Sequence, residues 1–312
     1  MARIFVARQL PGPALARLRQ THDVEVWPGR MPPSPEQLRE AAKDAEGLLT
    51  LLTDRVDAAL LDAAPDLKAI ANYAVGVDNI DLEATHRRGI AVGNTPDVLT
   101  EATADLTFTL LLAAARRLPE AMNAAVHGEW LTWEPGNWLG ADVHGATLGI
   151  VGMGRIGRAV ARRAAGFQME VIHAGRGEGG GAERVPLAQL LAHADFVSLH
   201  CPLTPETHHL IDASALRLMK RTAIVINTSR GGVVDQAALC HALRQERIAG
   251  AALDVADPEP PAIDDPLYDA PNLIVTPHIG SATRGARERM AALAADNLLA
   301  ALAGRPMPHP AP

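Results

Sequence analysis

A glycine-rich turn between an apolar run and a helical segment constrains the fold of this chain more than any other feature. Leu148 to Val151 lead into Gly152-Met153-Gly154-Arg155-Ile156-Gly157, and Ala159 to Ala165 continue with a helical composition. In such a unit the first glycine makes a tight turn, the second lets the backbone approach a pyrophosphate, and the third lets helix and strand pack closely. The helix N-terminus then offers free N–H groups to the phosphates. With a further strand at Met169 to His173, the pattern predicts a dinucleotide site.

The end of that second strand indicates which dinucleotide to expect. NAD-binding units place an Asp or Glu there, which binds the ribose 2′-OH. This chain has Gly175-Arg176 instead, and its first carboxylate is Glu178. An acidic side chain would repel a 2′-phosphate, whereas Gly followed by Arg leaves room for it and supplies charge-assisted hydrogen bonds. We therefore expect NADP(H) to be preferred over NAD(H). The alternative is that Arg176 is only a solvated arginine in the Gly-rich loop 175–181.

Length and composition fit two globular domains and argue against several other classes of protein. The chain has 312 residues, of which 48% are hydrophobic and 21% charged. Its net charge of −7 argues against a nucleic-acid partner. The most apolar stretch, Leu106 to Ala115, is about half as long as a membrane span and predicts a buried helix. Cys201 and Cys240 form no CxxC motif and no targeting segment follows Met1, so we expect a cytoplasmic protein without disulfides.

Short apolar runs alternate with helical segments along both halves of the chain. Strands that are spaced by helices of this length imply parallel sheets with crossover connections. After the glycine turn the alternation continues to a strand at Leu273 to Thr276, which predicts a doubly wound sheet of about six strands. A final helix at Ala286 to Ala303 is long enough to return to the N-terminal half. We therefore expect an α/β fold with two Rossmann-like parallel-sheet domains. The dinucleotide-binding domain, 99–283, is inserted into a split substrate-binding domain, 1–98 plus 284–312.

One loop of the first half is a candidate anion site. The segment NYAVGVDNID follows a predicted strand at Lys68 to Ala71. A glycine at the carboxyl end of a strand exposes backbone N–H groups where open α/β sheets bind ligands. We interpret Val75 and Gly76 as a nest for a carboxylate, and an ordinary turn is the alternative.

The segment between the two halves suggests an interface. From Thr100 the chain predicts a long helix, which contains ATADLTFTLLLAAARR, is apolar nearly all round and should be buried between domains or subunits. Trp130, Trp133 and Trp138 then lie in a polar loop that contains Pro and Gly, a setting that commonly marks an interface. Packing of this loop on its own domain is the alternative. We expect a homodimer.

Three predicted strand ends in the second half place polar side chains at the carboxyl edge of the sheet, where the cofactor should lie. They are Asn227 to Gly232, Leu253 to Pro260 and Thr276 to Ser281. Each polar residue alone is a weak signal, because the chain has 12 histidines. Their conjunction with the glycine turn predicts an active site.

With these motifs together, the chain resembles the D-isomer-specific 2-hydroxyacid dehydrogenases from about Arg3 to Pro308. The motifs are NYAVGVDNID, GIVGMGRIGRAVARR, VSLHCPLTPETHHLI, INTSRGGVVD, GAALDVADPEP and PHIGSAT. Within that family the chain is most similar to the glyoxylate and hydroxypyruvate reductases, because of NTPDVLTEATADLTFTLLLAAARRLPEA, GEWLTWEP and the Gly-Arg pair after the second strand. The resemblance implies that Arg230, Glu259 and His278 are catalytic and that Trp133 reaches a partner subunit's site.

The resemblance also implies the chemistry. A hydride reduces the carbonyl of a small 2-oxo acid to a 2-hydroxy acid, and His278 protonates the developing oxyanion. Glu259 orients and stabilises the charged imidazole, and Arg230 binds the substrate carboxylate. No metal is needed, because hydride chemistry is the cofactor's own. We expect the substrate to contact Leu51, Val75, Gly76, Trp133, Arg230 and His278. We expect the cofactor to contact Thr103, Gly152, Gly154, Arg155, Ile156, Gly157, Gly175, Arg176, Cys201, Pro202, Thr207, Thr228, Ser229, Asp254, His278 and Gly280.

Other functions stay open at this point. An NAD-linked D-lactate-type or phosphoglycerate-type dehydrogenase would use the same motifs, and phosphite dehydrogenase also resembles the family. The chain ends near Pro312 without room for an appended regulatory domain, which argues against the full-length phosphoglycerate type. A dehydrogenase-like corepressor, which uses the cofactor as a conformational sensor, is the alternative from another class. The long tails typical of such corepressors are missing.

Overall fold

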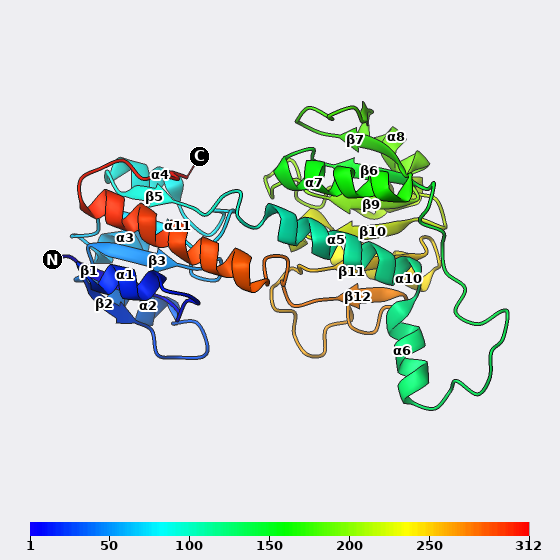
Figure 1. Cartoon of the computed structure of the whole chain (residues 1–312), viewed down its shortest axis with the longest axis horizontal. Coiled ribbons are helices and arrows are strands. Elements are labelled where there is room, and N and C mark those ends of the chain that lie inside the picture. The colour runs from blue at the N-terminus through cyan, green and yellow to red at the C-terminus, as the bar shows by residue number, and fades with distance from the viewer. Residues whose placement is uncertain (312) are drawn as a thin grey trace. The chain divides into compact units, whose positions relative to one another are not determined.

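The computed structural model describes residues 1–311, which form two α/β units (Figure 1). One unit contains residues 1–99 and the C-terminal segment from Ala282, and the other contains residues 100–281. Each unit is built on one parallel sheet, of five strands in the first and seven in the second. The expected α/β class, with two Rossmann-like parallel-sheet domains, is therefore confirmed.

The sheet of the first unit has the strand order β2-β1-β3-β4-β5, and its neighbours are all parallel. The strands are β1 (Arg3–Val6), β2 (Asp23–Val26), β3 (Gly47–Thr50), β4 (Ala69–Asn72) and β5 (Ala91–Gly93). The helices are α1 (Ala14–Arg19), α2 (Pro35–Ala42), α3 (Ala58–Ala63), α4 (Leu82–Arg87) and α11 (Arg284–Leu302). β3 and β4 are buried along their whole length, as strands covered on both faces must be.

Side chains at the helix starts explain why several of these helices begin where they do. Ser34 forms a capping box with Gln37 and is followed by Pro35 at the first helical position. Asp57, Asp81 and Thr283 each accept a hydrogen bond from a backbone N–H of the first turn of α3, α4 and α11. Each cap satisfies an N–H that has no partner inside the helix.

Asn297 joins the C-terminal segment to the first sheet. This residue of α11 is fully buried, and its Nδ2 donates to Asn94 O at 3.0 Å while its Oδ1 accepts from His309 N at 2.9 Å. Asn94 N in turn donates to His309 O, and Ala311 N donates to Val92 O. The segment after α11 therefore runs antiparallel along the outer edge of β5.

The sheet of the second unit has the order β12-β11-β10-β9-β6-β7-β8, also with parallel neighbours. The strands are β6 (Thr147–Val151), β7 (Glu170–Ala174), β8 (Glu183–Arg184), β9 (Phe196–Leu199), β10 (Ile224–Asn227), β11 (Gly250–Leu253) and β12 (Leu273–Val275). The helices are α5 (Thr100–Ala115), α6 (Leu118–Val126), α7 (Arg155–Ala164), α8 (Leu187–His193), α9 (Ala213–Leu218) and α10 (Gln236–Arg244). The order reverses at β6 and β9, which is where open α/β sheets bind ligands.

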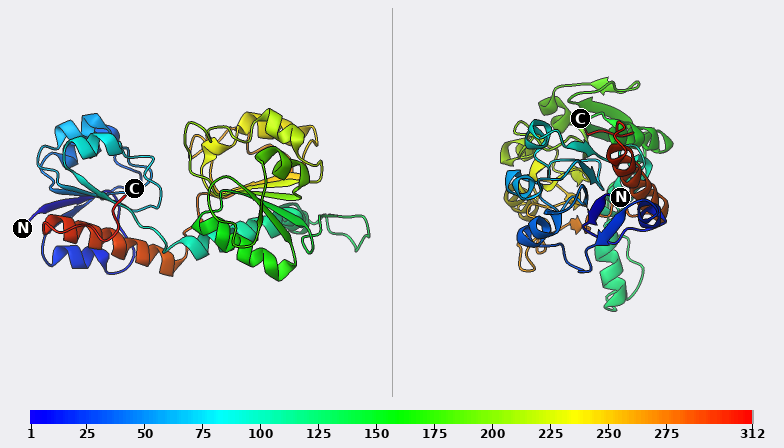
Figure 2. Two further views of the ribbon diagram at one scale, coloured as in Figure 1. Left: turned by 90° about the horizontal axis from the view of Figure 1, so that it is seen from above. Right: turned by 90° about the vertical axis from the view of Figure 1, so that its left-hand side faces the viewer.

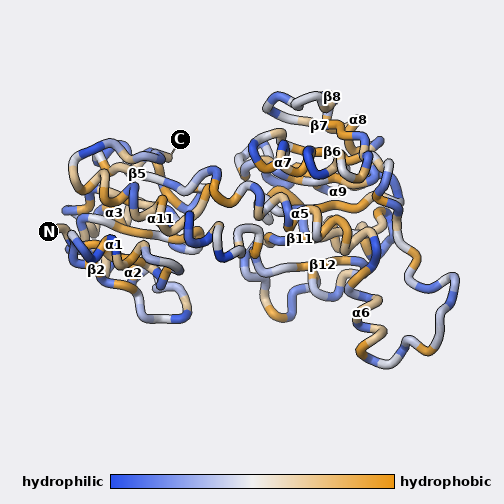
Figure 3. The backbone as a smooth tube through the Cα atoms, viewed as in Figure 1, coloured by the Kyte–Doolittle hydropathy of each residue, from blue (hydrophilic) through white to orange (hydrophobic). Residues whose placement is uncertain are grey.

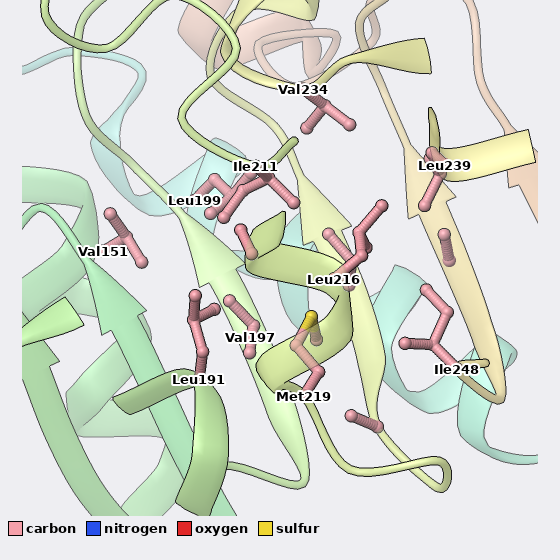
Figure 4. Packing of buried hydrophobic residues seen from close by; sticks show 14 of the residues in the cluster. Val151, Leu191, Val197, Leu199, Ile211, Leu216, Met219, Val234, Leu239 and Ile248 are labelled. Atoms are coloured by element: carbon pink, nitrogen blue, oxygen red, sulfur yellow. The ribbon is translucent and has the colours of Figure 1, made fainter. Parts of the chain in front are cut away.

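Helices cover both faces of this second sheet (Figure 2). Leu148 and Ile150 of β6 belong to the core under α5 and α7, while Val151 belongs to the core on the opposite face. Figure 4 shows part of that second core, where Leu216 of α9 and Met219, directly after α9, pack toward the strands. The central strands are correspondingly hydrophobic along their length (Figure 3). Ile150 and Val151 belong to different cores because successive side chains of a strand point to opposite faces of the sheet.

Three expectations about the second unit need correction. The sheet has seven strands rather than about six, because the exposed pair Glu183–Arg184 adds to β7 without any apolar pattern. The helix predicted from Thr100 ends at Ala115 rather than at Arg117, since Arg117 adopts a left-handed conformation with φ 50° and a separate helix, α6, follows. α5 does not need a second domain or subunit to bury it, because its core residues pack on α7, β10 and β11 of its own unit.

We expect Asn297→Ala to lower the free energy of unfolding by roughly 2–4 kcal/mol, because it leaves the backbone groups of Asn94 and His309 buried without partners. Urea unfolding followed by circular dichroism measures the change. Gln20→Ala, which removes an exposed side-chain amide directly after α1 in the same unit, is the control and should change stability by less than about 0.5 kcal/mol. Equal effects of the two substitutions would contradict this role of Asn297.

Candidate active site

The turn after β6 has a backbone that only glycine fits. Gly152 has a φ of +96°, and a Cβ built there would lie 2.7 Å from Cys201 N. A Cβ on Gly157 would lie 2.3 Å from Gly152 O, so the start of α7 could not approach β6 as closely with any other residue. Gly154 caps α7, and a Cβ there would meet open space. The turn therefore leaves the N-terminus of α7 accessible, which is the arrangement that binds a phosphate.

The loop after β7 is hydrogen-bonded to this turn. Gly152 N donates to Ala174 O at 2.9 Å, and Met153 N donates to Arg176 O at 3.3 Å. Gly175 and Gly177 have φ values of +93° and +106°, in the left-handed region that favours glycine. Arg176 itself is exposed. Its backbone is thus fixed beside the glycine turn while its guanidinium can reach solvent or a ligand.

The loop after β9 lies against the other side of the glycine turn. His200 N donates to Val151 O, and Ser198 Oγ and His200 Nε2 are 2.8 Å apart. Burial lowers the pKa of His200 to about 4 and raises the pKa of the Cys201 thiol, so both side chains are neutral at pH 7. Thr207 Oγ1 donates to Pro202 O at 2.6 Å, which closes the loop on itself. The predicted cofactor residues Cys201, Pro202 and Thr207 therefore share one hydrogen-bonded loop beside Gly152.

Asn227, the last residue of β10, holds the loop that contains Arg230. Its buried amide donates to Arg230 O at 2.8 Å and accepts from Ser229 N at 3.0 Å and from Ser229 Oγ at 2.8 Å. Thr228 Oγ1 is 2.9 Å from Thr107 Oγ1 of α5. The backbone of this loop is thus fixed on both sides of Arg230, and the partly exposed Arg230 side chain extends from it.

A buried carboxylate holds the loop that contains His278. Asp254, which follows β11, is 1% exposed and accepts from Thr276 Oγ1 at 2.6 Å, from Ile279 N at 2.8 Å and from Gly280 N at 2.7 Å. Gly280 O accepts from Thr103 Oγ1 at 3.2 Å, so α5 supports the same loop. The loop is tight enough to place His278 in a left-handed conformation, with φ 53°. Asp254 can therefore orient His278 without contacting it.

His278 and Glu259 form a close pair. His278 Nδ1 lies 2.5 Å from Glu259 Oε1, and the two side chains are 25% and 32% exposed. Glu259 Oε2 also accepts weakly from Ala256 N at 3.4 Å. A carboxylate on Nδ1 fixes the orientation of the ring and leaves Nε2 on the far side for a proton transfer. Arg230, Glu259 and His278 follow the adjacent strands β10, β11 and β12, so the second unit brings all three to one edge of its sheet.

The candidate substrate residues Leu51, Val75 and Gly76 lie at the carboxyl ends of β3 and β4 in the first unit. Asn72 Nδ2 donates to Gly76 O at 2.8 Å, and Asn94 Nδ2 donates to Val75 O at 2.7 Å. These bonds turn the two carbonyls toward the sheet. The carbonyl of Leu51 is held similarly, by Asn79 Nδ2 at 3.0 Å.

The tryptophan loop is exposed in the single chain. α6 and the loop after it project from the rest of the second unit (Figures 1 and 2). Trp130 is 68% exposed and Trp133 is 81% exposed, and Val126 and Leu131 beside them are more than 80% exposed. Packing of the loop on its own domain, the alternative left open by the sequence, does not account for these two tryptophans. Apolar side chains this exposed commonly mark an interaction surface.

Some residues of the site lack a recognisable sequence signal. In the sequence, Asn227 is only part of a motif, His200 is one histidine among several, and Gln236 is merely the start of a predicted helix. His200 and Gln236 contact segments that are distant along the chain, whereas Asn227 bonds within its own loop. The described residues contain no group of three or more His, Cys, Asp or Glu side chains that could hold a metal ion. Within residues 1–311, none of the helices is long and apolar enough to span a membrane.

Comparisons with known proteins agree with this geometry. Residues 108–280 match the family model of the D-isomer specific 2-hydroxyacid dehydrogenase, NAD binding domain. A glyoxylate reductase of Korarchaeum cryptofilum is 50% identical over 314 residues, which cover 98% of this chain and 95% of that protein. The chain belongs to the D-isomer specific 2-hydroxyacid dehydrogenase family. It is therefore an oxidoreductase whose second unit is a nicotinamide-cofactor domain, and the resemblance seen in the motifs is confirmed.

Solved structures of this family share the fold of the whole chain. A crystal structure of a protein from Thermus thermophilus is 52% identical, with a TM-score of 0.95 and coverage of 99% of both chains. An NADPH-dependent glyoxylate/hydroxypyruvate reductase from Sinorhizobium meliloti, in complex with NADP and malonate, is 32% identical, with a TM-score of 0.87 and coverage of 99% of this chain and 96% of that one.

We expect His200 to make the stability of this dehydrogenase sensitive to acid. The pKa of His200 is about 4 in the folded chain against an ordinary 6.5, so the unfolded state binds the proton more tightly. The stability due to neutral His200 is complete above pH 6.5 and is lost as the pH falls toward 4, by at most roughly 3 kcal/mol. His200→Gln should therefore flatten the dependence of unfolding free energy on pH between 6.5 and 4. His241→Gln, at an exposed position of α10, should leave it unchanged.

Proposed function

We propose that this dehydrogenase reduces small 2-oxo acids, glyoxylate and hydroxypyruvate in particular, to 2-hydroxy acids and prefers NADPH. The observation that carries the proposal is the 2.5 Å pair of His278 and Glu259 on the sheet edge that also bears Arg230. A proton donor with a carboxylate partner and a permanent cation are the groups that carbonyl reduction of a carboxylate substrate requires. The names of the relatives, glyoxylate reductases among them, support the same choice of substrate.

The residues present fit a nicotinamide dinucleotide. Gly152, Gly154 and Gly157 leave the N-terminus of α7 uncovered, and a side chain at Gly152 or Gly157 would fill the turn. We propose that the α7 N-terminus binds the pyrophosphate and that Thr103, Arg155, Ile156, Cys201, Pro202, Thr207, Thr228, Ser229, Asp254 and Gly280 contact the remainder. When bound, the cofactor supplies the hydride that reduces the substrate carbonyl.

In this proposal, three side chains of the protein bind the substrate, donate the proton and orient the proton donor. Arg230 has a planar cationic guanidinium, the group that matches a carboxylate, so it can bind the substrate carboxylate and stabilise charge on the carbonyl oxygen. His278 donates the proton from Nε2 to that oxygen, because Nδ1 is occupied by Glu259. Glu259 holds the ring in place through its contact with Nδ1. We further propose that Val75 and Gly76 bind the substrate carboxylate through their N–H groups and that Leu51 contacts the substrate.

Purified protein should oxidise NADPH when glyoxylate is added, and His278→Gln should lower kcat by at least about 100-fold, because positioned acid catalysis is worth this much or more. The absorbance of NADPH, followed at saturating glyoxylate, measures the effect. His241→Gln, at an exposed position in the same unit, should retain full activity. A His278→Gln enzyme with more than a tenth of wild-type kcat would exclude the general-acid role. Turnover of phosphite with NAD⁺ but not of any 2-oxo acid would exclude the proposed substrate class.

The choice of NADPH rests on the loop after β7. Gly175 leaves space there, and Arg176 is exposed within it and hydrogen-bonded through its carbonyl to the glycine turn. The nearest acid in sequence, Glu178, is also exposed. The pKa of Glu206, in the loop after β9, is lowered mainly by a hydrogen bond from Thr204, and the charge of Arg176 contributes. Arg176 is therefore close enough to the loop after β9 for its charge to act on Glu206.

Arg176→Ala should raise the ratio of KM for NADPH to KM for NADH by roughly 10-fold, the value of a partly exposed hydrogen bond to a charged group. Initial rates with both cofactors at saturating glyoxylate give this ratio. Arg221→Ala is the matched control, since Arg221 is an exposed arginine that precedes β10 at the opposite edge of the sheet. If Arg176→Ala and Arg221→Ala give the same ratio as the wild type, Arg176 is only a surface residue and the cofactor preference needs another explanation.

We also propose that the protein is a homodimer and that the segment from α6 through Trp138 forms part of the interface. Five large apolar side chains of this segment, Met122, Val126, Trp130, Leu131 and Trp133, are at least 60% exposed in the single chain. Covering them with a second copy would remove a considerable apolar surface from water. Trp133 is the residue that we propose to reach the partner's site.

A further inference from the structure

The loops that contain Arg230 and Glu259 are interlocked through their backbones. A Cβ built on Gly231 would lie 2.0 Å from both the carbonyl carbon and the carbonyl oxygen of Ala256, and 2.6 Å from Asp257 N. The peptide unit between Ala256 and Asp257 therefore packs directly on Gly231, one residue after Arg230. Any displacement of one loop must move the other.

Gln236 is hydrogen-bonded to the same peptide region and clamps it. Its Nε2 donates to Asp257 O at 2.8 Å, and its Oε1 accepts from Asp257 N at 2.7 Å. A side-chain amide that both donates to and accepts from one residue satisfies that residue's backbone as a neighbouring strand would. Without Gln236, both backbone groups of Asp257 would depend on water.

Gln236 is well placed to act as a fixed support. It is the first residue of α10, whose start is capped by Asp235 Oδ1 accepting from Ala238 N at 2.9 Å. Leu239, Cys240 and Leu243 anchor α10 in the core of the second unit. The amide therefore projects from a rigid element rather than from a loop.

The clamp is two residues from Glu259. Glu259 Oε1 lies 2.5 Å from His278 Nδ1, a separation that a displacement of even about 1 Å would turn into a weak contact. A contact chain thus runs from α10 through Gln236 and Asp257 to Glu259, and from Glu259 to His278. Gln236 lies outside the sequence motifs from which the site was predicted.

We propose that Gln236 is a positioning residue for the reduction, which holds Glu259 at the distance that keeps the ring of His278 oriented. The inference rests on the proposed function, because it assigns Gln236 a part in the same proton transfer. It requires a side chain that can both donate and accept hydrogen bonds at this position. Alanine can do neither, and glutamate can only accept when it is ionised.

The test compares Gln236→Ala with Gln245→Ala. Gln245 is an exposed glutamine directly after α10, so the control removes the same side chain at the other end of the helix. We expect Gln236→Ala to lower kcat for glyoxylate by about 10-fold, because small misplacements of catalytic groups cost this much or more. The loss should fall on kcat rather than on KM. KM for NADPH should change by less than about 2-fold.

Gln236→Glu separates positioning from a general loss of packing. It preserves the size of the side chain and the acceptor for Asp257 N, so its kcat should lie between those of the wild type and Gln236→Ala. Thermal unfolding of all variants should agree within a few degrees. If Gln236→Ala shows the kcat of Gln245→Ala, Gln236 has no part in positioning and the inference is overturned.

A further measurement distinguishes failure of this inference from failure of the proposed function. Wild-type protein that reduces no 2-oxo acid would refute the proposed function. Hydrogen–deuterium exchange then tests the clamp without turnover, because Gln236→Ala should speed exchange of the peptide that contains Asp257 and Glu259 by at least about 10-fold, whereas Gln245→Ala should not. Equal exchange in both variants would refute the clamp itself.

Discussion

The geometry of the site depends on buried polar side chains that hydrogen-bond to the backbone just beyond the strand ends. Asp254 accepts three hydrogen bonds from the segment around His278, and Asn227 makes three with the segment around Arg230. A buried carboxylate or amide is costly unless it is fully hydrogen-bonded, so each of these loops has one conformation that satisfies its anchor. Functional side chains on loops can therefore be held as accurately as side chains on strands.

Both units hold the loops at their strand ends with polar side chains that hydrogen-bond to the loop backbone. In the first unit, Asn72 and Asn79 bond to each other and to the carbonyls of Gly76 and Leu51, which fixes the loops at the ends of β3 and β4. In the second unit, the anchors lie at the ends of β10 and β11. In both cases the parallel strands bring the anchors to one edge of the sheet, and the sequence between strands is free to vary in length. This is why a parallel α/β sheet can combine residues that are distant along the chain.

Much of this arrangement could be predicted because its signals are local. The turn at Gly152 to Gly157 combines steric needs that no other residue meets, and the apolar runs before Asn227 and Asp254 mark strands that are buried on both faces. Elements without a local signal could not be found in this way. β8 consists of two charged residues, and α6 begins after a left-handed arginine rather than a glycine. Gln236 bonds to a residue 21 positions away, and no pattern within α10 distinguishes it from Gln245. Helical and strand periodicity report which face is buried, but not which side chain bonds to which backbone.

The segment that follows α11 has a consequence for how copies of this protein behave at high concentration. An open parallel sheet exposes two rows of unpaired backbone groups, which can add a strand from another chain. In the first unit, residues 309–311 occupy the outer edge of β5, and Pro310 there has no N–H to offer to a further strand. The opposite edge, β2, carries Asp23 and Glu25, whose charges disfavour pairing with another strand. The five-stranded sheet is thus closed to edge-to-edge association by a short tail on one side and by acidic side chains on the other.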